Sequence, residues 1–225
     1  MKKNLLIGLA MGMFMMDCIG SAEANVIDEI YGAGAGSFEI GTFSDNSGGY
    51  NFMSLPVENN TIAGWTVGGP GGGIDWLHAP FWGVDTGSYA VDLQSNSGVY
   101  GQDNSSIATT IPTVLGNTYR LTFGAATTTG YNAEGIVSAG SLLNQAFTAT
   151  FSPTFASQSY TAFSFLFTAT GSTTEIRFTA NNPNTIYGPV IDSVNVSAVP
   201  IPAAFWLFGS GLVSLNVFRR FNKSA

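Results

Sequence analysis

The sequence has 225 residues, and only 9% of them are charged, against roughly 25% in ordinary soluble domains. Between residues 25 and 198, twelve carboxylates stand against two arginines, Arg120 and Arg177, so this region carries a net charge near −10. Such a balance excludes nucleic-acid binding, which needs several lysines or arginines to neutralise phosphates. Few charges, 28 glycines and many threonine and aromatic residues favour short strands and turns over a helical bundle, whose outer faces would be rich in lysine and glutamate.

The first 24 residues have the three parts of a secretory signal peptide. Lys2 and Lys3 give a positive start, residues 5–16 form an apolar run of twelve, and Ala22 and Ala24 frame a small-residue cleavage site. Twelve apolar residues are too few to span a hydrocarbon core of about 30 Å. We therefore expect signal peptidase to remove residues 1–24 and the remainder to be exported.

The single cysteine, Cys18, lies inside this leader. The exported part is therefore expected to contain no disulfide and no thiolate metal site. Lipid attachment at Cys18 is the alternative, but Asp17 before it is not the small residue that lipoprotein cleavage prefers.

Residues 25–198 are predicted to form one all-β domain. Apolar and polar residues alternate clearly in residues 119–123, 174–178 and 191–196, as strands with one buried face require. Further strands are expected at residues 64–67, 74–77, 89–93, 106–111, 146–151 and 163–169, separated by turns rich in glycine and asparagine. About nine strands without a ten-residue amphipathic helix indicate an antiparallel β-sandwich or jelly roll, flanked by the signal-peptide helix and a C-terminal hydrophobic helix.

An aromatic turn after the 74–77 strand is the best candidate for ligand recognition. Sugar rings stack their apolar faces on flat aromatic side chains, while nearby carboxylates bind their hydroxyl groups. The predicted carbohydrate-binding residues are Asp75, Trp76, Phe81, Trp82 and Asp85. Packing in the core is the alternative for the tryptophans: we expect it for Trp65 and Trp76, and both interpretations stay open for Trp82.

Catalysis is not expected. Asp75 with Asp85 or Asp92 could provide the paired carboxylates of a glycosidase, but solvated carboxylates in loops or at strand ends are the simpler interpretation. His78, the single histidine, has no second histidine or serine nucleophile beside it in the sequence, so a role as general base or metal ligand is disfavoured. We interpret it as a loop histidine among aromatic residues.

The C-terminal 27 residues, 199–225, form a separate segment. Pro200 and Pro202 make a rigid extended hinge, because proline fixes φ and disfavours helix in the residue before it. An uncharged stretch at 203–218 then ends at Arg219 and Arg220. Sixteen helical residues span about 24 Å, so this stretch is predicted to be a short membrane helix with the arginines on the cytoplasmic side.

This segment resembles a PEP-CTERM sorting signal. The resemblance rests on the order of a hinge, an apolar run containing Trp-Leu-Phe-Gly-Ser-Gly, and a basic end; the sorting-motif residues are Val199, Pro200, Ile201, Pro202, Arg219 and Arg220. The departure is Ile201, where the family's name-giving motif has glutamate. The resemblance implies cleavage by a membrane exosortase in a Gram-negative bacterium that makes exopolysaccharide, with the chain held only transiently in the inner membrane.

Four motifs follow one another through the middle of the chain: Gly-Ser-Phe-Glu at 36–39, Gly-Trp-Thr-Val at 64–67, Tyr-Arg-Leu-Thr-Phe at 119–123 and Gly-Pro-Val-Ile-Asp at 188–192. In these motifs and their order the chain resembles the choice-of-anchor C and DUF642-like proteins, relatives of galactose-binding and carbohydrate-binding jelly rolls. The resemblance implies a structural calcium ion held partly by Glu39 and Asp192, which match the acidic positions after the first phenylalanine and on the last strand. Calcium prefers such oxygen ligands.

These observations together predict an exported, non-catalytic protein of the cell envelope, outer surface or extracellular matrix that associates with exopolysaccharide. A structural or adhesive matrix protein without a small-ligand site is the second hypothesis, and a secreted glycosidase is the third.

Overall fold

A computed structural model describes residues 24–70, 72–95, 104–127, 132–150, 154–181 and 187–200. The predicted cleavage residue Ala24 and the first two hinge residues, Val199 and Pro200, fall within these ranges. The rest of the predicted signal peptide and sorting tail, including Ala22, Ile201, Pro202, Arg219 and Arg220, lies outside them.

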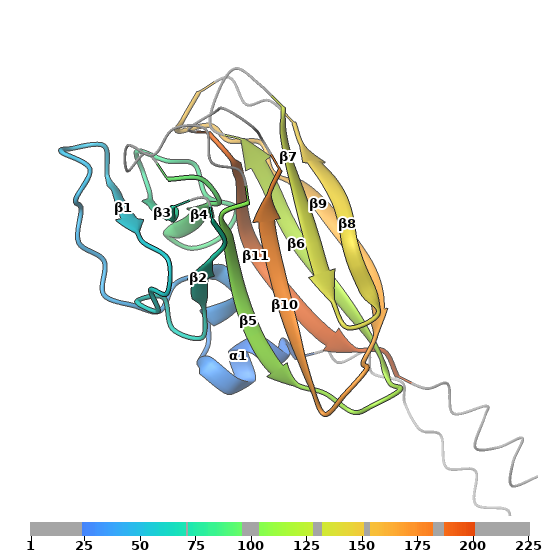
Figure 1. The fold of residues 1–225 in the computed structure, drawn as a ribbon. Coiled ribbons are helices and arrows are strands. Elements are labelled where there is room, and N and C mark those ends of the chain that lie inside the picture. Colours follow the sequence, from blue (N-terminus) through green and yellow to red (C-terminus); the bar gives the residue numbers. More distant parts are fainter. Residues whose placement is uncertain are drawn as a thin grey trace, which may run out of the picture.

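The described residues form two antiparallel sheets that face one another (Figure 1). One sheet has six strands in the order β1-β3-β4-β11-β6-β9. Their bounds are β1 Phe52–Leu55, β3 Ile74–His78, β4 Tyr89–Asp92, β11 Pro189–Ala198, β6 Thr118–Thr127 and β9 Thr161–Thr168. The last strand in sequence, β11, therefore lies inside this sheet, paired with β4 on one side and β6 on the other.

The second sheet has five strands in the order β2-β5-β10-β7-β8. Their bounds are β2 Thr66–Gly68, β5 Ser106–Pro112, β10 Thr173–Ala180, β7 Ala133–Ala139 and β8 Leu142–Ala149. The expected all-β antiparallel sandwich is thus confirmed. The nine expected strands are found, and β1 and β7 are additional to them.

The main core lies between the two sheets. Period-two alternation turns one set of side chains inward on each strand, and the largest fully buried ones include Trp65, Trp76, Phe123 and Phe178. Phe123 of β6 meets Phe178 of the opposite sheet edge to face, with ring centroids 4.9 Å apart, an arrangement that aromatic quadrupoles favour.

A short helix, α1 (Val26–Tyr31), and a 3₁₀ turn at Ala35–Ser37 precede the sheets and are tied to β11. The Asn25 side chain caps α1 by accepting from the Ile27 N–H, accepts from the Val196 N–H at 3.1 Å, and donates to the Val194 carbonyl at 2.9 Å. One asparagine thus satisfies a helix start and orphan groups of the last strand together. Among the described residues, no helix is both long and apolar enough to cross a membrane.

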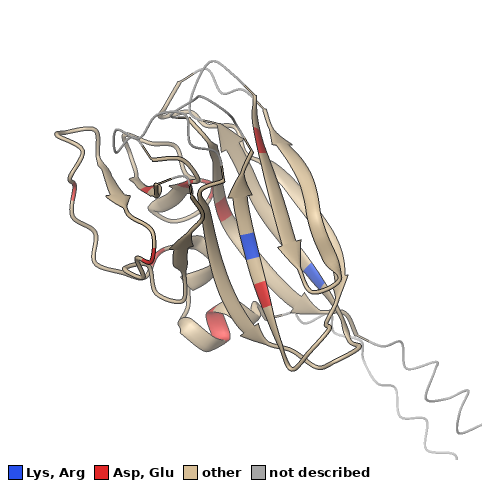
Figure 2. Cartoon of the chain, viewed as in Figure 1, with Lys and Arg blue, Asp and Glu red and all other residues tan. Residues whose placement is uncertain are grey.

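Charged side chains are sparse on the sandwich, and acidic ones predominate (Figure 2). Within the described part of the chain, an ion pair joins Arg177 to Glu175 at 2.9 Å. Burial of apolar side chains, rather than ion pairing, therefore stabilises this fold.

Candidate functional site

A cavity of about 310 Å³ opens on the outer face of the six-stranded sheet, over β1, β3 and β4. Ile74 and Trp76 of β3 point into the main core, whereas Asp75 and Leu77 point to the outer face. We call this site the aromatic cavity, and it is lined by Tyr50, Phe52, Asp75, Leu77, Phe81, Trp82, Asp92, Phe155 and Tyr187.

Two aromatic rings of the cavity are accessible to solvent. Tyr50 is 58% exposed and Phe81 is 36% exposed, and their rings meet edge to face with centroids 6.1 Å apart. Phe81 also stacks on Phe155 at 6.2 Å, with an angle of 19° between the ring planes. Exposed flat rings of this kind offer a surface on which a planar or sugar-like ligand can stack.

Trp82 is part of the wall of the cavity rather than an exposed ring. It is 6% exposed, and it packs in a second hydrophobic cluster with Phe52, Leu77, Ala90 and Val190. Its Nε1–H donates to the Tyr50 carbonyl at 2.7 Å, which satisfies the buried donor. Of the two interpretations left open for Trp82, packing is the one that the structure supports.

Trp76 does not line the cavity. It is fully buried on the opposite face of β3, where it packs against Tyr89 at 4.7 Å and Phe43 at 5.5 Å. The expected core position of Trp76 is confirmed, and its ring is not part of the aromatic cavity because strand alternation turns it inward.

The base of the cavity carries two carboxylates on neighbouring strands. Asp75 and Asp92 are directly opposite in the β3–β4 register and are 5% and 3% exposed. Asp75 Oδ1 accepts from the hydroxyl groups of Ser54 at 2.6 Å and Ser95 at 2.9 Å. Asp92 Oδ1 accepts from the backbone N–H groups of Gln94 and Gly188.

Burial raises the pKa of Asp92 well above its usual range; the nearby Asp75 charge adds to this rise, and the hydrogen bonds from Gln94 and Gly188 oppose it. The protonated form of Asp92 is therefore more favourable here than it is for an aspartate exposed to solvent.

Asp85, Glu39 and Asp192 lie at the loop between β3 and β4. Asp192 Oδ2 accepts from the backbone N–H groups of Asp85 and Thr86, and Glu39 Oε1 accepts from those of Ser88 and Tyr89. The Asp85 side chain is exposed and does not line the cavity. The structure therefore separates Asp85 from Asp75 and uses the two predicted metal ligands to hold one loop.

His78 is the last residue of β3. Its ring stacks on Tyr89 with centroids 4.7 Å apart, and its Nδ1 lies 2.9 Å from the Asn51 side-chain amide. His78 thus lies among aromatic residues as expected, but it ends a strand instead of lying in a loop.

Sequence analysis missed the cavity residues Tyr50, Phe155 and Tyr187. Each is an isolated aromatic residue in a segment rich in glycine, serine, asparagine or proline. Single aromatic residues in turn-rich segments are the signal that could have marked them, because such segments run over the surface.

A family model described as "Protein of unknown function (DUF642)" matches residues 34–197. None of the curated proteins matches the chain. The match falls within the expected domain of residues 25–198 and confirms the resemblance to DUF642 proteins.

Solved structures with a similar fold include a family 35 carbohydrate binding module from Clostridium thermocellum, with 14% identity and a TM-score of 0.42, covering 65% of this chain and 97% of that one. The CBM22-1 xylan-binding domain from Paenibacillus barcinonensis has 12% identity and a TM-score of 0.46, covering 66% and 94%. A cyclase from Fischerella sp. TAU has 15% identity and a TM-score of 0.48, covering 73% and 94%. At this identity the likeness extends to the fold alone.

Replacing Trp82 should destabilise the folded domain. We expect Trp82→Ala to lower the free energy of unfolding by about 3 kcal/mol or more, because it empties a buried aromatic position. Phe81→Ala, the adjacent exposed ring, should cost only about 1 kcal/mol. Urea denaturation of the two variants measures the difference, and equal losses would contradict the assigned burial.

Stability should fall as pH rises from about 4 to about 7. Burial raises the pKa of Asp192 to about 7, against the opposing hydrogen bonds from the Thr86, Ser193 and Asp85 N–H groups, and the pKa of Asp92 is raised too. In this window the folded protein keeps protons that the unfolded chain has released, so the unfolding free energy decreases with pH.

Asp92→Asn provides the test, because it keeps an oxygen for the Gln94 and Gly188 N–H groups but cannot ionise. Urea denaturation at several pH values should give a shallower fall for this variant than for the wild type. Parallel curves would show that Asp92 does not contribute.

Proposed function

This chain belongs to the DUF642 family, and we propose that it is an exported, non-catalytic protein that binds polysaccharide through the aromatic cavity. The observation that carries the proposal is the pairing of accessible rings with buried polar groups. Tyr50 and Phe81 stand at the opening, and Asp75 and Asp92 lie at the base.

This combination suits a sugar ring. The apolar C–H face of the sugar would stack on Phe81 or Tyr50, while its hydroxyl groups would meet the carboxyl groups below. The cavity volume of about 310 Å³ is at the lower end of small-molecule sites. It therefore suits one or two sugar units at the end or on a branch of a longer chain.

The environment of the carboxylates supports binding rather than catalysis. A glycosidase needs an acid and a second carboxylate free to attack or to activate water. Asp75 Oδ1 already holds two serine hydroxyl groups, Asp92 is buried with two backbone donors, and Asp85 is away from the cavity. Release of reducing sugar from a polysaccharide would overturn this part of the proposal.

We further propose the route predicted from the ends of the chain: export by the signal peptide, then transient anchoring and sorting by exosortase to the envelope, outer surface or matrix of a Gram-negative bacterium. The strands end at Ala198, and the Val199 N–H still donates to the Thr118 carbonyl at 2.9 Å. The predicted hinge at 199–202 thus begins directly after the last described strand.

A structural calcium ion at Glu39 and Asp192 stays a prediction. Each carboxylate accepts hydrogen bonds from two backbone N–H groups of the β3–β4 loop. Among the described residues, no group of three or more histidine, cysteine or acidic residues could hold a metal ion. Calcium would therefore need backbone carbonyl oxygens for most of its ligands.

The alternative is a structural or adhesive matrix protein without a small-ligand site. Four large apolar side chains, two of them adjacent in the sequence, favour it by their exposure: Val114 59%, Leu115 69%, Leu143 73% and Leu166 53%. Exposed apolar surface of this kind promotes self-association.

Polysaccharide retention tests the binding proposal. In native gels containing xylan, dextran or polygalacturonate, we expect at least one polysaccharide to retard the mature protein. The double variant Tyr50→Ala/Phe81→Ala should weaken that retention about tenfold, equivalent to about 1.4 kcal/mol. Leu115→Ala, an exposed apolar side chain outside the cavity, is the control, and equal retention of the double variant and the control would contradict the proposal.

The intact mass of the mature protein from its own host tests the route. We expect a chain that begins at Asn25 and ends near Pro200 or Pro202, because both terminal segments would be removed. A mass that still contains residues 203–225 would mean that the tail is a plain membrane anchor, and the exosortase proposal would fall.

A further inference from the structure

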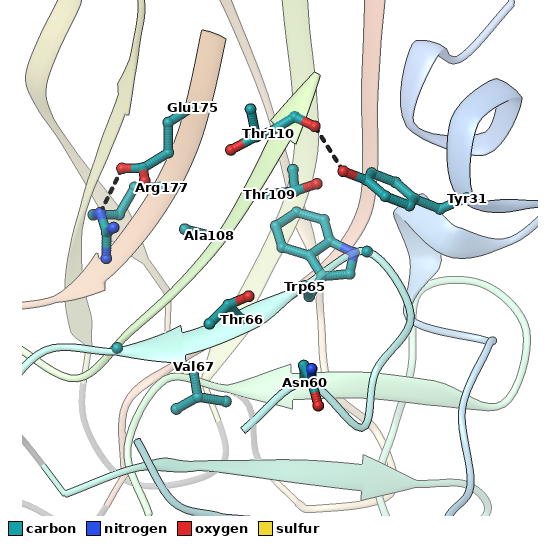
Figure 3. Close-up of a pocket in the computed structure, with 12 residues that line it drawn as sticks. Tyr31, Asn60, Trp65, Thr66, Val67, Ala108, Thr109, Thr110, Glu175 and Arg177 are labelled. Carbon is teal, nitrogen blue, oxygen red and sulfur yellow. Dashed lines mark hydrogen bonds and ion pairs between the residues drawn. The ribbon is translucent and has the colours of Figure 1, made fainter. Parts of the chain in front are cut away.

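A second hollow lies on the other sheet, over its outer face at β2, β5 and β10 (Figure 3). Its volume is about 510 Å³. We call it the polar groove, and its lining includes Tyr31, Asn60, Trp65, Thr66, Ala108 and Arg177. Because the aromatic cavity is on the outer face of the six-stranded sheet, the two sites lie on opposite faces of the sandwich.

The floor of the groove follows from strand register. Thr66 of β2, Ala108 of β5 and Arg177 of β10 are consecutive partners across the sheet. Neighbouring strands are about 4.8 Å apart, so the methyl group of Ala108 between two longer side chains leaves a trough. Ala108 is 7% exposed, whereas the Thr66 side chain is exposed.

Two glycines let the walls come close. A Cβ on Gly64 would lie 2.5 Å from the Tyr31 ring, and a Cβ on Gly68 would lie 3.1 Å from Arg177 Nη1. Gly64 therefore allows the Tyr31 ring to lie against the backbone, where its hydroxyl donates to the Thr110 carbonyl at 2.7 Å. Gly68 leaves room for the guanidinium group of Arg177.

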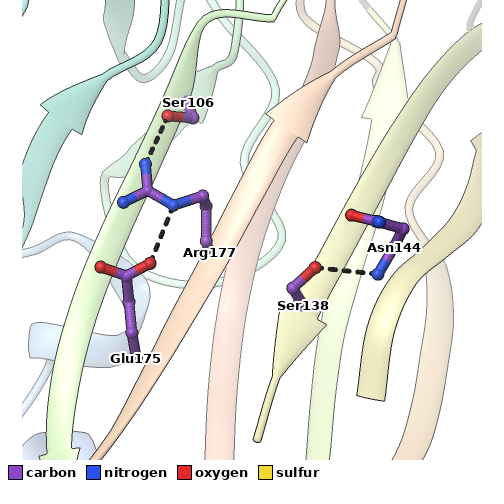
Figure 4. Close-up of polar contacts among 5 residues, drawn as sticks. All are labelled: Ser106, Ser138, Asn144, Glu175 and Arg177. Atoms are coloured by element: carbon purple, nitrogen blue, oxygen red, sulfur yellow. Dashed lines mark hydrogen bonds and ion pairs between the residues drawn. The ribbon is translucent and has the colours of Figure 1, made fainter. Parts of the chain in front are cut away.

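Arg177 is held in place by two contacts (Figure 4). Its Nε donates to Glu175 at 2.9 Å, and its Nη1 donates to the Ser106 hydroxyl at 2.9 Å. The guanidinium group of Arg177, fixed by Glu175 and Ser106, is pre-organised, so it loses little entropy when a ligand binds. On the neighbouring strand β7, Ser138 is the register partner of Arg177, and its hydroxyl accepts a hydrogen bond from the Asn144 N–H at 2.9 Å.

We propose that the polar groove is a second carbohydrate site, for a neutral polysaccharide segment. Arg177 and Glu175 neutralise one another and together offer donors and acceptors, Asn60 and Thr66 add exposed polar groups, and Tyr31 supplies a ring edge. Hydroxyl-rich, uncharged chains match such a lining. A polyanion would meet an acidic protein with one paired arginine at this site, so it is disfavoured. The groove is separate from the aromatic cavity and does not depend on ligand binding there.

Native gels containing xylan, dextran or polygalacturonate test this proposal with the mature protein. In the Tyr50→Ala/Phe81→Ala background, we expect residual retention by xylan or dextran. Adding Arg177→Ala, or Ala108→Phe to fill the trough, should weaken that residual retention about tenfold. Circular dichroism confirms that each variant is folded.

Matched controls come from the same protein. Arg120→Ala removes the arginine of the six-stranded sheet, and Ala146→Phe adds a ring at an exposed position of β8; both should leave retention unchanged. The proposal is overturned if the cavity variant retains no binding, if Arg177→Ala and Ala108→Phe behave like the controls, or if only polygalacturonate retards the protein. If Tyr50→Ala/Phe81→Ala by itself abolishes retention, the proposed function stands and only the proposal of a second site in the polar groove is rejected.

Discussion

The pairing of β11 between β4 and β6 is the interaction on which the N-terminal helix and the β3–β4 loop both depend. The Asn25 side chain bonds the backbone of Val194 and Val196, so the N-terminal helix is fixed to the same strand. Nearer the start of β11, Asp192 Oδ2 accepts hydrogen bonds from the backbone N–H groups of Asp85 and Thr86. The register shift between Asp192 and Asn195 lets Ile191, Val194 and Val196 all face the main core, because a bulge re-aims side chains that regular pleating would alternate. Both the first and the middle parts of the domain thus depend on its last strand.

The two candidate sites differ in physical character because the two outer faces are built differently. The cavity face is covered by two loops, whose Trp82 and Phe155 pack onto Phe52 and Val190, so it has a hydrophobic cluster of its own. On the groove face, the described residues include no such cover at Ala108, and hydroxyl, amide and guanidinium groups line the hollow beside it. One face therefore suits the apolar side of a sugar, and the other suits its polar rim.

Strands with strong alternation were predictable from the sequence, as at residues 119–123, 174–178 and 191–196. β7 was missed because alanine and glycine weaken its pattern; Gly135 is small because a Cβ there would lie 2.2 Å from the Phe147 ring. At the site, Asp75, Phe81 and Trp82 were predicted and do share the cavity. Tyr50, Phe155 and Tyr187 reach it from distant segments, and the burial of Trp82 depends on Phe52 and Val190, so neither could be deduced from local spacing.

The interior position of the last strand determines when the six-stranded sheet can be completed during folding. The chain is synthesised from its N-terminus, so β4 and β6 are available before β11. Until Pro189–Ala198 is available, β4 and β6 each lack a neighbour, and the Asn25 cap has no strand to bind. The six-stranded sheet is therefore completed only by its last strand, which in the proposed export would be among the last parts of the domain to cross the membrane.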